Sequence, residues 1–378
     1  MRILLLSNAP WSNSGYGNQS RIFLSRLAEL GHDMGIICFY GLEGGVLNMG
    51  KITCYPKRMH PYGNDVVVPH SMAFRADITI SLMDTWVMNP EEYPPGMRWV
   101  PWYPVDHDPI PPIVRSKIAL AWKRIAMSQF GVEKTHEAGR DCSYIPHGGE
   151  TNVMKPLDKA ECRKALGLPG DKWIVGTVAM NKGNPSRKCF AEMLHAFAAF
   201  HRKHPDTLYA LQTDRGEGVN DMVNIPELAR GLGLTEGVDY TLCNQYQNMV
   251  GYPPEYLAQF YNSLDVHMLT SKGEGFGIPT LEAQACAVPV IVGGWTASKE
   301  LCFSGQCLDA ERDAEREYTA LASYQYRPLV KSIERALERE YNHASSKEKA
   351  LAGALPYDAD EVVKNHWIPV LKEIEAAL

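Results

Sequence analysis

The nine residues from Glu274 to Glu282 read Glu-Gly-Phe-Gly-Ile-Pro-Thr-Leu-Glu and constrain the fold more than any other part of the chain. The two glycines allow backbone conformations and close approaches that a side chain would forbid. The proline suits the first turn of a helix, where its missing N–H is not needed. Apolar strand patterns lie on both sides, at residues 265–269 and 288–292. The order strand, turn, helix, strand predicts part of a parallel α/β sheet.

The same residues form a candidate ligand site. The N–H groups of Phe276, Gly277 and Ile278 are expected to point at whatever lies in front of the helix, and a helix N-terminus favours an anion such as phosphate. Glu274 lies at the lip of the turn, and Glu282 lies three residues after Pro279, about one turn into the helix, where it can face the same cleft. Amides for a diphosphate and carboxylates for hydroxyl groups together suit a sugar nucleotide. The alternative is a surface glutamate before an ordinary helix.

Length, charge and cysteine usage restrict the class of protein. At 378 residues the chain exceeds the size at which one core usually stops growing, so two domains are expected. Residues 1–150 carry 14 basic and 14 acidic side chains, so no basic half indicates nucleic acid or an anionic membrane. The nine cysteines form no C-x-x-C pair, which favours reduced thiols. We expect a cytoplasmic protein without a transmembrane segment, and peripheral contact with a membrane stays open.

The first part of the chain predicts one parallel sheet. A buried strand pattern at 3–7 leads into a loop with Gly15 and Gly17, an amphipathic helix at 19–31 and a strand at 34–40. Residues 41–68 show no clear periodicity and are assigned only loops and short strands. Further strands are expected at 76–82, 99–105, 125–128 and 142–145.

A second series of strands and helices follows a boundary predicted near residues 148–170. We therefore expect an α/β fold of two Rossmann-like, doubly wound parallel-sheet domains, residues 1–150 and 165–355. Residues 357–377 read as a helix that Pro369 interrupts, which predicts a kink or break. The expected strands of the second domain lie at 173–179, 207–212 and 238–243, with helices at 189–203, 225–231 and 254–262.

Several segments resemble retaining GT-B glycosyltransferases of the family-4 type, or glycosyl transferases group 1. Besides the Glu-x7-Glu segment they are Ser14-Gly15-Tyr16-Gly17, residues 144–148, Asn181 to Lys188 and residues 261–266. The resemblance implies two Rossmann-like domains that face each other across a cleft. It implies a retaining transfer of a sugar from a nucleotide-diphospho-sugar, a UDP- or GDP-sugar, to an acceptor hydroxyl without a metal. The C-terminal helix, about residues 358–378, would join the first domain, and a helix that caps the second domain is the alternative.

The resemblance also assigns roles to single residues. Glu274 would contact the transferred sugar, and Glu282 would hold the ribose hydroxyls. Arg187 and Lys188 would stabilise the negative charge of the departing diphosphate. The other donor-binding residues that it implies are Gly15, Gly17, Tyr246, Gly275, Phe276, Gly277 and Ile278.

Two parts of the donor site stay open. Many family members carry an arginine where this chain has Asn181, so the division of labour between Lys182 and the Arg187–Lys188 pair is not decided. The nucleotide base of the donor is expected to bind at the loop after the strand at 238–243, around Asn244, Gln245 and Tyr246. Tyr246 as a packed aromatic residue is the alternative.

Residues 105–109, Val-Asp-His-Asp-Pro, end a predicted strand of the first domain. Asp106 and Asp108 formally make a D-x-D, the pair of carboxylates that holds a metal–diphosphate in GT-A enzymes. In a second interpretation, Asp106 or His107 orients the acceptor hydroxyl or accepts its proton. A loop held by Asx-type hydrogen bonds is the third. Because the donor signature lies in the second domain, we expect no metal. Further acceptor-side candidates are Asp84, Trp86 and Asp108.

Two other classes of protein fit the same pattern. A G-x-G turn after a strand also occurs in NAD-dependent dehydrogenases and sugar-nucleotide epimerases. These enzymes need an acidic residue after the second strand to bind the ribose, and Glu43 is the candidate in this chain. A non-catalytic sugar-nucleotide-binding protein is the other alternative. The sequence leaves the acceptor open: a glycan, a small molecule, a protein, a lipid or a modified DNA base. The oligomeric state is open as well.

Overall fold

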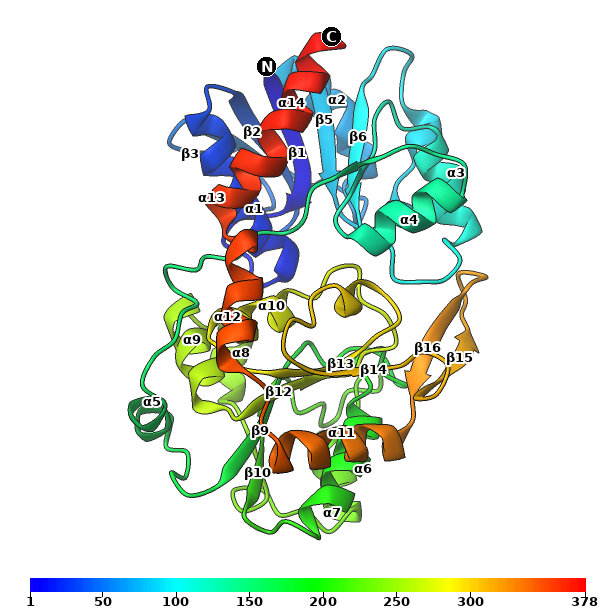
Figure 1. Cartoon of the computed structure of the whole chain (residues 1–378). Coiled ribbons are helices and arrows are strands. Elements are labelled where there is room, and N and C mark those ends of the chain that lie inside the picture. The colour runs from blue at the N-terminus through cyan, green and yellow to red at the C-terminus, as the bar shows by residue number, and fades with distance from the viewer. The chain divides into compact units, whose positions relative to one another are not determined.

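The computed structural model describes all residues, Met1–Leu378, and the chain forms two compact units (Figure 1). The first unit contains Met1–Gly148, Ala320–Ser323 and Tyr357–Leu378, and the second contains Gly149–Thr319 and Tyr324–Pro356. Each unit is built on its own sheet with helices packed on it. The predicted α/β class with two parallel-sheet domains is confirmed.

The first unit contains an eight-stranded sheet in the order β3-β4-β2-β1-β5-β6-β7-β8. Its neighbours run parallel except for β3 and β4, which form an antiparallel pair. The central strands read as continuous apolar runs, which is typical of a parallel sheet that is covered on both faces. The strands are β1 (Arg2–Asn8), β2 (Asp33–Tyr40), β3 (Leu47–Met49), β4 (Ile52–Pro56), β5 (Ile78–Leu82), β6 (Trp99–Tyr103), β7 (Ile125–Ala126) and β8 (Ser143–Tyr144).

Helix α1 begins at Gly15, earlier than the residue 19 that the pattern predicted. The Ser14 hydroxyl accepts a hydrogen bond from the N–H of Gly17 (3.1 Å) and caps the helix. A Cβ atom at Gly17 would lie 2.2 Å from the Ser12 hydroxyl oxygen, so only glycine allows this approach. The two glycines therefore form the first helical turn rather than a loop. The helices of this part are α1 (Gly15–Glu29), α2 (Asn64–Phe74), α3 (Pro112–Ala119) and α4 (Gln129–Glu137), with 3-10 turns η1 (Thr85–Val87) and η2 (Pro90–Glu92).

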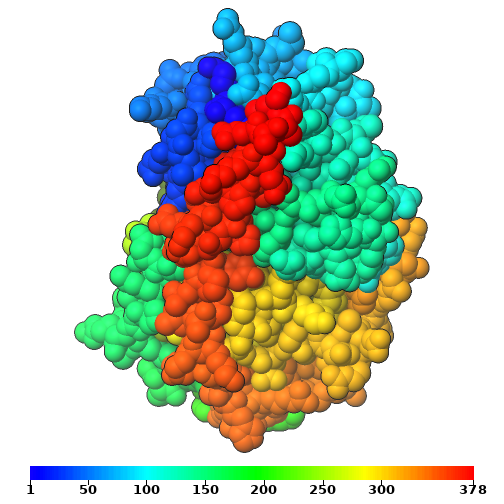
Figure 2. Space-filling view, turned by 45° about the horizontal axis from the view of Figure 1, so that its top comes forward, coloured from blue at the N-terminus to red at the C-terminus, as the bar shows by residue number.

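The C-terminal segment is interrupted, as the proline predicts. It consists of α13 (Ala359–Val362), a π-helical stretch (Val363–Trp367) and α14 (Ile368–Ala376), with Pro369 in the first turn of α14. The buried ring of Trp367 packs against Phe23 of α1 and Trp102 of β6, with ring centroids 5.8 and 5.0 Å away. Figure 2 shows this segment, in red, lying along the blue N-terminal residues.

The second unit contains a parallel six-stranded sheet in the order β11-β10-β9-β12-β13-β14 and a separate antiparallel hairpin, β15–β16. Its strands are β9 (Trp173–Val178), β10 (Thr207–Gln212), β11 (Tyr240–Leu242), β12 (Val266–Leu269), β13 (Val290–Gly293), β14 (Gly305–Leu308), β15 (Ala314–Tyr318) and β16 (Tyr324–Pro328). Its helices are α5 (Lys159–Leu166), α6 (Phe190–His201), α7 (Ile225–Gly231), α8 (Gln245–Val250), α9 (Pro254–Ser263), α10 (Ile278–Ala285), α11 (Val330–Asn342) and α12 (Lys347–Ala354).

The core of the second unit lies between its sheet and α6, α7 and α11. Phe190, Phe197 and Phe200 of α6 are almost fully buried there, beside Tyr209 of β10 and Ile333 of α11. No helix of the chain is long and apolar enough to cross a lipid bilayer.

Candidate functional site

The Glu274–Glu282 segment lies in the second unit, between β12 and α10. Gly277 precedes α10 with φ +112°, a conformation that side chains rarely adopt, so the turn needs glycine here. Pro279 lies in the first turn of α10. Gly275, the buried Phe276 and the half-buried Ile278 complete the turn that presents the N-terminus of α10. The local order of strand, glycine turn and helix is the one predicted.

Glu274 is a buried carboxylate with cationic partners. It is 6% exposed, and its N–H donates to the Thr296 hydroxyl (2.9 Å). Lys188 Nζ lies 2.5 Å from Oε1, and Arg187 Nη1 lies 3.4 Å from Oε2. Burial would raise the pKa of Glu274, but the charges of Lys188 and Arg187 outweigh it and hold the pKa below its ordinary value. Glu274 is therefore an ionised carboxylate at neutral pH.

Arg187 and Lys188 belong to the loop between β9 and α6. The Arg187 guanidinium also donates to the carbonyl of Gly273, and the Arg187 carbonyl accepts the N–H of Lys272 (2.8 Å). The side chain of Arg187 is 41% exposed and that of Lys188 is 16% exposed. The two predicted cations thus lie beside Glu274 with part of their charge accessible to a ligand.

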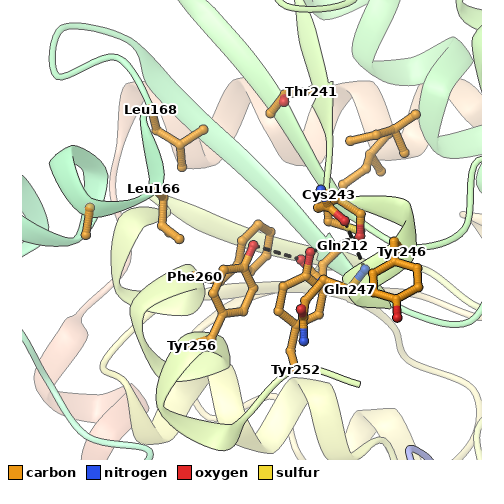
Figure 3. A pocket seen from close by; sticks show the side chains of 14 residues that line it. Leu166, Leu168, Gln212, Thr241, Cys243, Tyr246, Gln247, Tyr252, Tyr256 and Phe260 are labelled. Atoms are coloured by element: carbon orange, nitrogen blue, oxygen red, sulfur yellow. Dashed lines mark hydrogen bonds between the residues drawn. The ribbon is translucent and has the colours of Figure 1, made fainter. Parts of the chain in front are cut away.

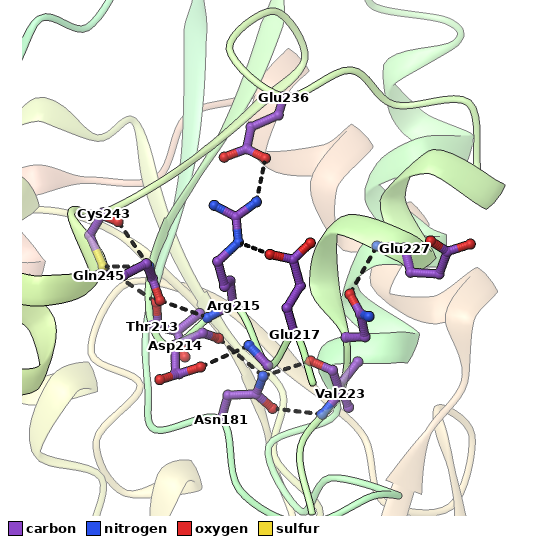
Figure 4. A network of polar contacts seen from close by, with 12 residues as sticks. Asn181, Thr213, Asp214, Arg215, Glu217, Val223, Glu227, Glu236, Cys243 and Gln245 are labelled. Carbon is purple, nitrogen blue, oxygen red and sulfur yellow. Dashed lines mark hydrogen bonds and ion pairs between the residues drawn. The ribbon is translucent and has the colours of Figure 1, made fainter. Parts of the chain in front are cut away.

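Asn181 connects loops of the second unit (Figure 4). Its amide nitrogen donates to the carbonyls of Asp214 (3.1 Å) and Val223 (2.7 Å), and its oxygen accepts the N–H of Val223 (3.1 Å). The residue is fully buried, so its amide has a structural use. The next residue, Lys182, is exposed, so at this point of the loop the accessible positive charge is that of Lys182.

Glu282 lies on α10 and is oriented by a buried tyrosine. The Tyr261 hydroxyl donates to Glu282 Oε2 at 2.8 Å, and Tyr261 on α9 is fully buried. Burial and the nearby carboxylate raise the pKa of Tyr261 well above its ordinary value, so it stays a donor over the working pH range. Glu282 keeps one face toward solvent because it is only partly buried.

Side-chain hydrogen bonds of Asn244 and Gln245 fix the segment that is predicted to bind the nucleotide base. Asn244 caps α8 by accepting the N–H of Gln247 (2.9 Å). The Gln245 oxygen accepts the N–H of Arg215 (2.9 Å), and its nitrogen donates to the carbonyl of Cys243 (2.9 Å) (Figure 4). Tyr246 differs from these two residues because its side chain is 70% exposed. This rules out Tyr246 as a packed aromatic residue.

Tyr246 lines a pocket of about 560 Å³ (Figure 3). The rings of Tyr252 and Tyr256 stack inside it, with centroids 4.0 Å apart and planes inclined by 17°. The Tyr256 hydroxyl donates to the Gln212 side-chain oxygen (3.4 Å). A size of this order suits a drug-sized ligand, and aromatic rings together with polar side chains such as Gln212 and Asn244 can both stack on and hydrogen-bond to such a ligand. The other lining residues are Ala165, Leu166, Leu168, Leu211, Thr241, Leu242, Cys243, Asn244, Gln247 and Phe260.

The acceptor-side candidates and the Gly15–Gly17 turn lie in the first unit. Gly15 and Gly17 follow β1, and Asp84 and Trp86 follow β5. Trp86 is 40% exposed, and Asp84 is partly buried. All of them therefore lie at the carboxyl edge of the first sheet, where ligands bind in open α/β sheets.

The D-x-D carboxylates point to different partners. Asp106 Oδ1 lies 2.7 Å from Nδ1 of the buried His107, and Asp108 Oδ1 lies 3.1 Å from Nζ of the buried Lys134. Glu137 also contacts Lys134, at 2.9 Å. No group of three or more metal-ligating side chains occurs in the chain. Asp106 and His107 form a carboxylate–imidazole pair, whereas Asp108 belongs to an ion-pair cluster.

Two residues that contact the site glutamates, and one buried histidine of the first unit, are not predicted by the sequence. Tyr261 orients Glu282, and Thr296 binds the backbone of Glu274. His147 is buried against Trp102, with ring centroids 4.9 Å apart, and burial lowers its pKa to about 3. Tyr261 belongs to segment 261–266, which resembles the family, so the sequence could have indicated that this residue lies near the site. Its hydrogen bond to Glu282 could not have been predicted from the sequence. No pattern in the sequence singles out Thr296.

Comparison with known proteins gives one family match and many structural matches. Residues 220–323 match the family described as Glycosyl transferases group 1. D-inositol 3-phosphate glycosyltransferase of Acidothermus cellulolyticus is 30% identical over 181 residues, 45% of this chain and 37% of that protein. The enzyme of the same name from Saccharomonospora viridis is 28% identical over 197 residues, 50% of this chain and 43% of that protein. The matches thus span less than half the length of these relatives.

The fold as a whole matches solved structures. Sucrose-phosphate synthase from Thermosynechococcus elongatus superposes with a TM-score of 0.77 at 15% identity, and the match covers 100% of both chains. HepE of Anabaena in complex with UDP-glucose gives a TM-score of 0.65 at 17% identity, again over 100% of both chains. The chain is thus similar to group 1 glycosyltransferases over residues 220–323, and its fold as a whole is the GT-B fold.

Proposed function

We propose that the protein transfers a sugar from a nucleotide-diphospho-sugar to an acceptor hydroxyl. The observation that carries the proposal is the buried Glu274 carboxylate held by Lys188 and Arg187 at the N-terminus of α10. A cation pair and a helix N-terminus favour a diphosphate, and a carboxylate beside them can accept hydrogen bonds from sugar hydroxyls. The relatives that the sequence matches are named as glycosyltransferases, which supports the same reaction class.

Each charged group has a role in this reaction. Lys188 and Arg187 stabilise the charge that develops on the departing nucleoside diphosphate. Glu274 positions the transferred sugar, and Glu282, oriented by Tyr261, holds the ribose hydroxyls. The Lys188 ammonium has three N–H donors, so it can keep its contact with Glu274 while it binds a phosphate oxygen. The catalytic effect is mainly positioning and electrostatic stabilisation.

The reaction retains the configuration of the sugar and needs no metal in this proposal. The acceptor attacks from the face that the diphosphate leaves, and a departing phosphate oxygen takes the acceptor proton. Two cations next to Glu274 supply positive charge that a metal ion would otherwise provide. The Asp106–His107 pair orients the acceptor hydroxyl.

The donor is a UDP- or GDP-sugar, with its base next to Tyr246 at the pocket of the second unit. The exposed Tyr246 ring offers a stacking surface, because every base has a flat aromatic face. HepE, which has the same fold, was solved with UDP-glucose, and this supports UDP as the first nucleotide to test.

Thermal-shift screening followed by a transfer assay tests the proposal. We expect UDP or GDP to stabilise the protein and NAD to have no effect. Lys188→Ala should lower kcat by about a hundredfold or more, because one lost charge-stabilising contact costs roughly 3–4 kcal/mol in the transition state. The matched control is Lys331→Ala, which removes an exposed cation of α11 in the same unit.

Three results would contradict the proposal. Stabilisation by NAD alone would indicate a dehydrogenase or an epimerase. Nucleotide binding without hydrolysis or transfer of any UDP-, GDP- or ADP-sugar would indicate a non-catalytic binding protein. A β-configured product from an α-configured donor, read by NMR of the anomeric proton, would overturn retention alone.

A further inference from the structure

The hairpin β15–β16 contacts the segment that leads to Glu274. Its two strands pair only with each other and lie outside the six-stranded sheet of the second unit (Figure 1). The N–H of Tyr326 on β16 donates to the carbonyl of Lys272 at 3.0 Å. On β15, both carboxylate oxygens of Glu317 accept from the Lys272 ammonium, at 2.7 and 2.8 Å. The hairpin therefore binds Lys272, two residues before Glu274, through its backbone and through its side chain.

Lys272 is a buried cation with one carboxylate partner. Its side chain is 6% exposed, whereas that of Glu317 is 39% exposed. Glu317 is the only acidic side chain that forms an ion pair with Lys272. An ammonium that leaves water needs such a partner, because the desolvation of an unpaired charge is costly. The buried position of Lys272 therefore depends on Glu317.

Lys272 is also bound to the loop that carries the two cations of the donor site. Its N–H donates to the carbonyl of Arg187 at 2.8 Å. The side chains of Arg187 and Lys188 contact the two carboxylate oxygens of Glu274. The loop between β9 and α6 and the segment before α10 are therefore connected to each other directly. Lys272 connects both of them to the hairpin.

An aromatic contact supports the same connection. Trp295 is 5% exposed, and its ring stacks on that of Tyr326, with centroids 6.0 Å apart and planes inclined by 25°. The indole N–H of Trp295 donates to the carbonyl of Ser271 at 3.0 Å. The carbonyls of two consecutive residues, Ser271 and Lys272, are thus bound by Trp295 and by the hairpin. These contacts fix the backbone that leads to Glu274.

We propose that Glu317 and Lys272 are positioning residues, and that through this ion pair the hairpin holds the donor-site cations and Glu274 in place. The inference rests on the proposed transferase function. Neither Glu317 nor Lys272 touches the donor in this proposal. Their effect on the reaction comes from geometry, because a displacement of about 1 Å at a reacting centre can cost roughly a hundredfold in rate. The donor site would then need a hairpin that belongs to neither parallel sheet.

Amide hydrogen exchange tests the positioning without any ligand. Glu317→Ala should speed up the exchange of the Lys272 N–H about tenfold or more, because the hydrogen bond of this N–H to Arg187 opens more often when the ion pair is lost. Lys272→Arg should keep slow exchange, since a guanidinium can still pair with Glu317. The matched control is Glu315→Ala, which removes a carboxylate of the same strand that pairs with Arg327. Unchanged exchange in Glu317→Ala, or an equal change in Glu315→Ala, would overturn the inference.

Nucleotide binding supplies the second readout, with UDP or GDP, whichever stabilises the wild-type protein. At a temperature where the variants are folded, Glu317→Ala and Lys272→Met should each weaken the Kd about tenfold, and Lys272→Arg should restore most of the affinity. The double variant should lose no more than the larger single effect, because both changes break the same contact.

Two results would assign the ion pair to stability alone and overturn the inference. One is a lower unfolding temperature of Glu317→Ala and Lys272→Met together with an unchanged nucleotide Kd. The other is a loss of affinity that adds up in the double variant. A wild-type protein that binds no nucleotide would instead count against the proposed function, and the exchange of the Lys272 N–H would still decide whether the hairpin holds this segment.

Discussion

Replacing Tyr261 by phenylalanine isolates the contact that orients Glu282. The change removes one hydroxyl and leaves the fully buried ring, so no cavity forms in the core around α9. It leaves Glu282 Oε2 without the donor that lies 2.8 Å away. A hydrogen bond to a charged group contributes about 1.5–3 kcal/mol to stability.

We expect about 1 kcal/mol of that energy to appear in nucleotide binding, because Glu282 is partly exposed and water can replace the lost donor. This corresponds to a roughly fivefold weaker Kd for the nucleoside diphosphate. The turnover number should change little, because the ribose contact is the same in the ground state and the transition state. The donor KM should rise in parallel with Kd.

Isothermal titration with UDP or GDP measures the effect, and Tyr209→Phe is the control. Tyr209 is also a fully buried tyrosine of the second unit, and its hydroxyl contacts Thr177 at 2.8 Å, away from Glu282. The reasoning is wrong if Tyr261→Phe leaves the nucleotide Kd unchanged, or if Tyr209→Phe weakens it equally. A fall in kcat with constant KM would also refute it, since it would place Glu282 in transition-state stabilisation.

Two further predictions concern stability. Gly17→Ala should lower the free energy of unfolding in urea by roughly 1–3 kcal/mol, because the new Cβ would lie 2.2 Å from the Ser12 hydroxyl oxygen. The control Gly170→Ala, where the space around the glycine is open, should have little effect. Equal effects of the two changes would contradict the packing argument. Burial lowers the folded-state pKa of both His147 and His267 to about 3, whereas the ordinary value is near 6.5. The folded state therefore holds both rings neutral. Their contribution to the free energy of unfolding is complete above pH 6.5 and is lost as the pH falls toward 3. Each histidine should contribute up to about 1.4 kcal/mol per pH unit in that window, and His267→Gln should remove its share from a urea titration series at pH 7, 6 and 5; a pH slope that this variant leaves unchanged would contradict the assignment.

The regular parts of the fold could be predicted because local patterns determine them. The buried strands are continuous apolar runs, and the glycines and prolines mark their ends. The apolar pattern predicts the start of α1 four residues too late, because the capping by Ser14 depends on a close approach of Gly17 to Ser12 that no periodicity reports. The α10 turn was placed well because its glycine and proline positions have few structural alternatives.

The candidate site shows the same division between local and long-range information. Lys188 and Glu274 are 86 residues apart, and a resemblance, not a local pattern, assigns both to the donor site; their direct contact is seen only in the structure. Asp106 and Asp108 look equivalent in the sequence, yet one contacts His107 and the other Lys134. Which partner a carboxylate chooses depends on tertiary packing, so sequence patterns could propose these side chains but not pair them.

The C-terminal segment has a consequence for the synthesis of the protein. Trp367 packs on Phe23 and Trp102, so the first unit needs residues from both ends of the chain, and the second unit is inserted within it. On the ribosome, the second unit has most of its residues before the last helix of the first unit emerges. Domains generally fold as units during translation, so the inserted unit can complete its core first. The face of α1 that receives Trp367 stays uncovered until residues 357–378 have been translated, which makes the nascent first unit the part that most needs protection from aggregation.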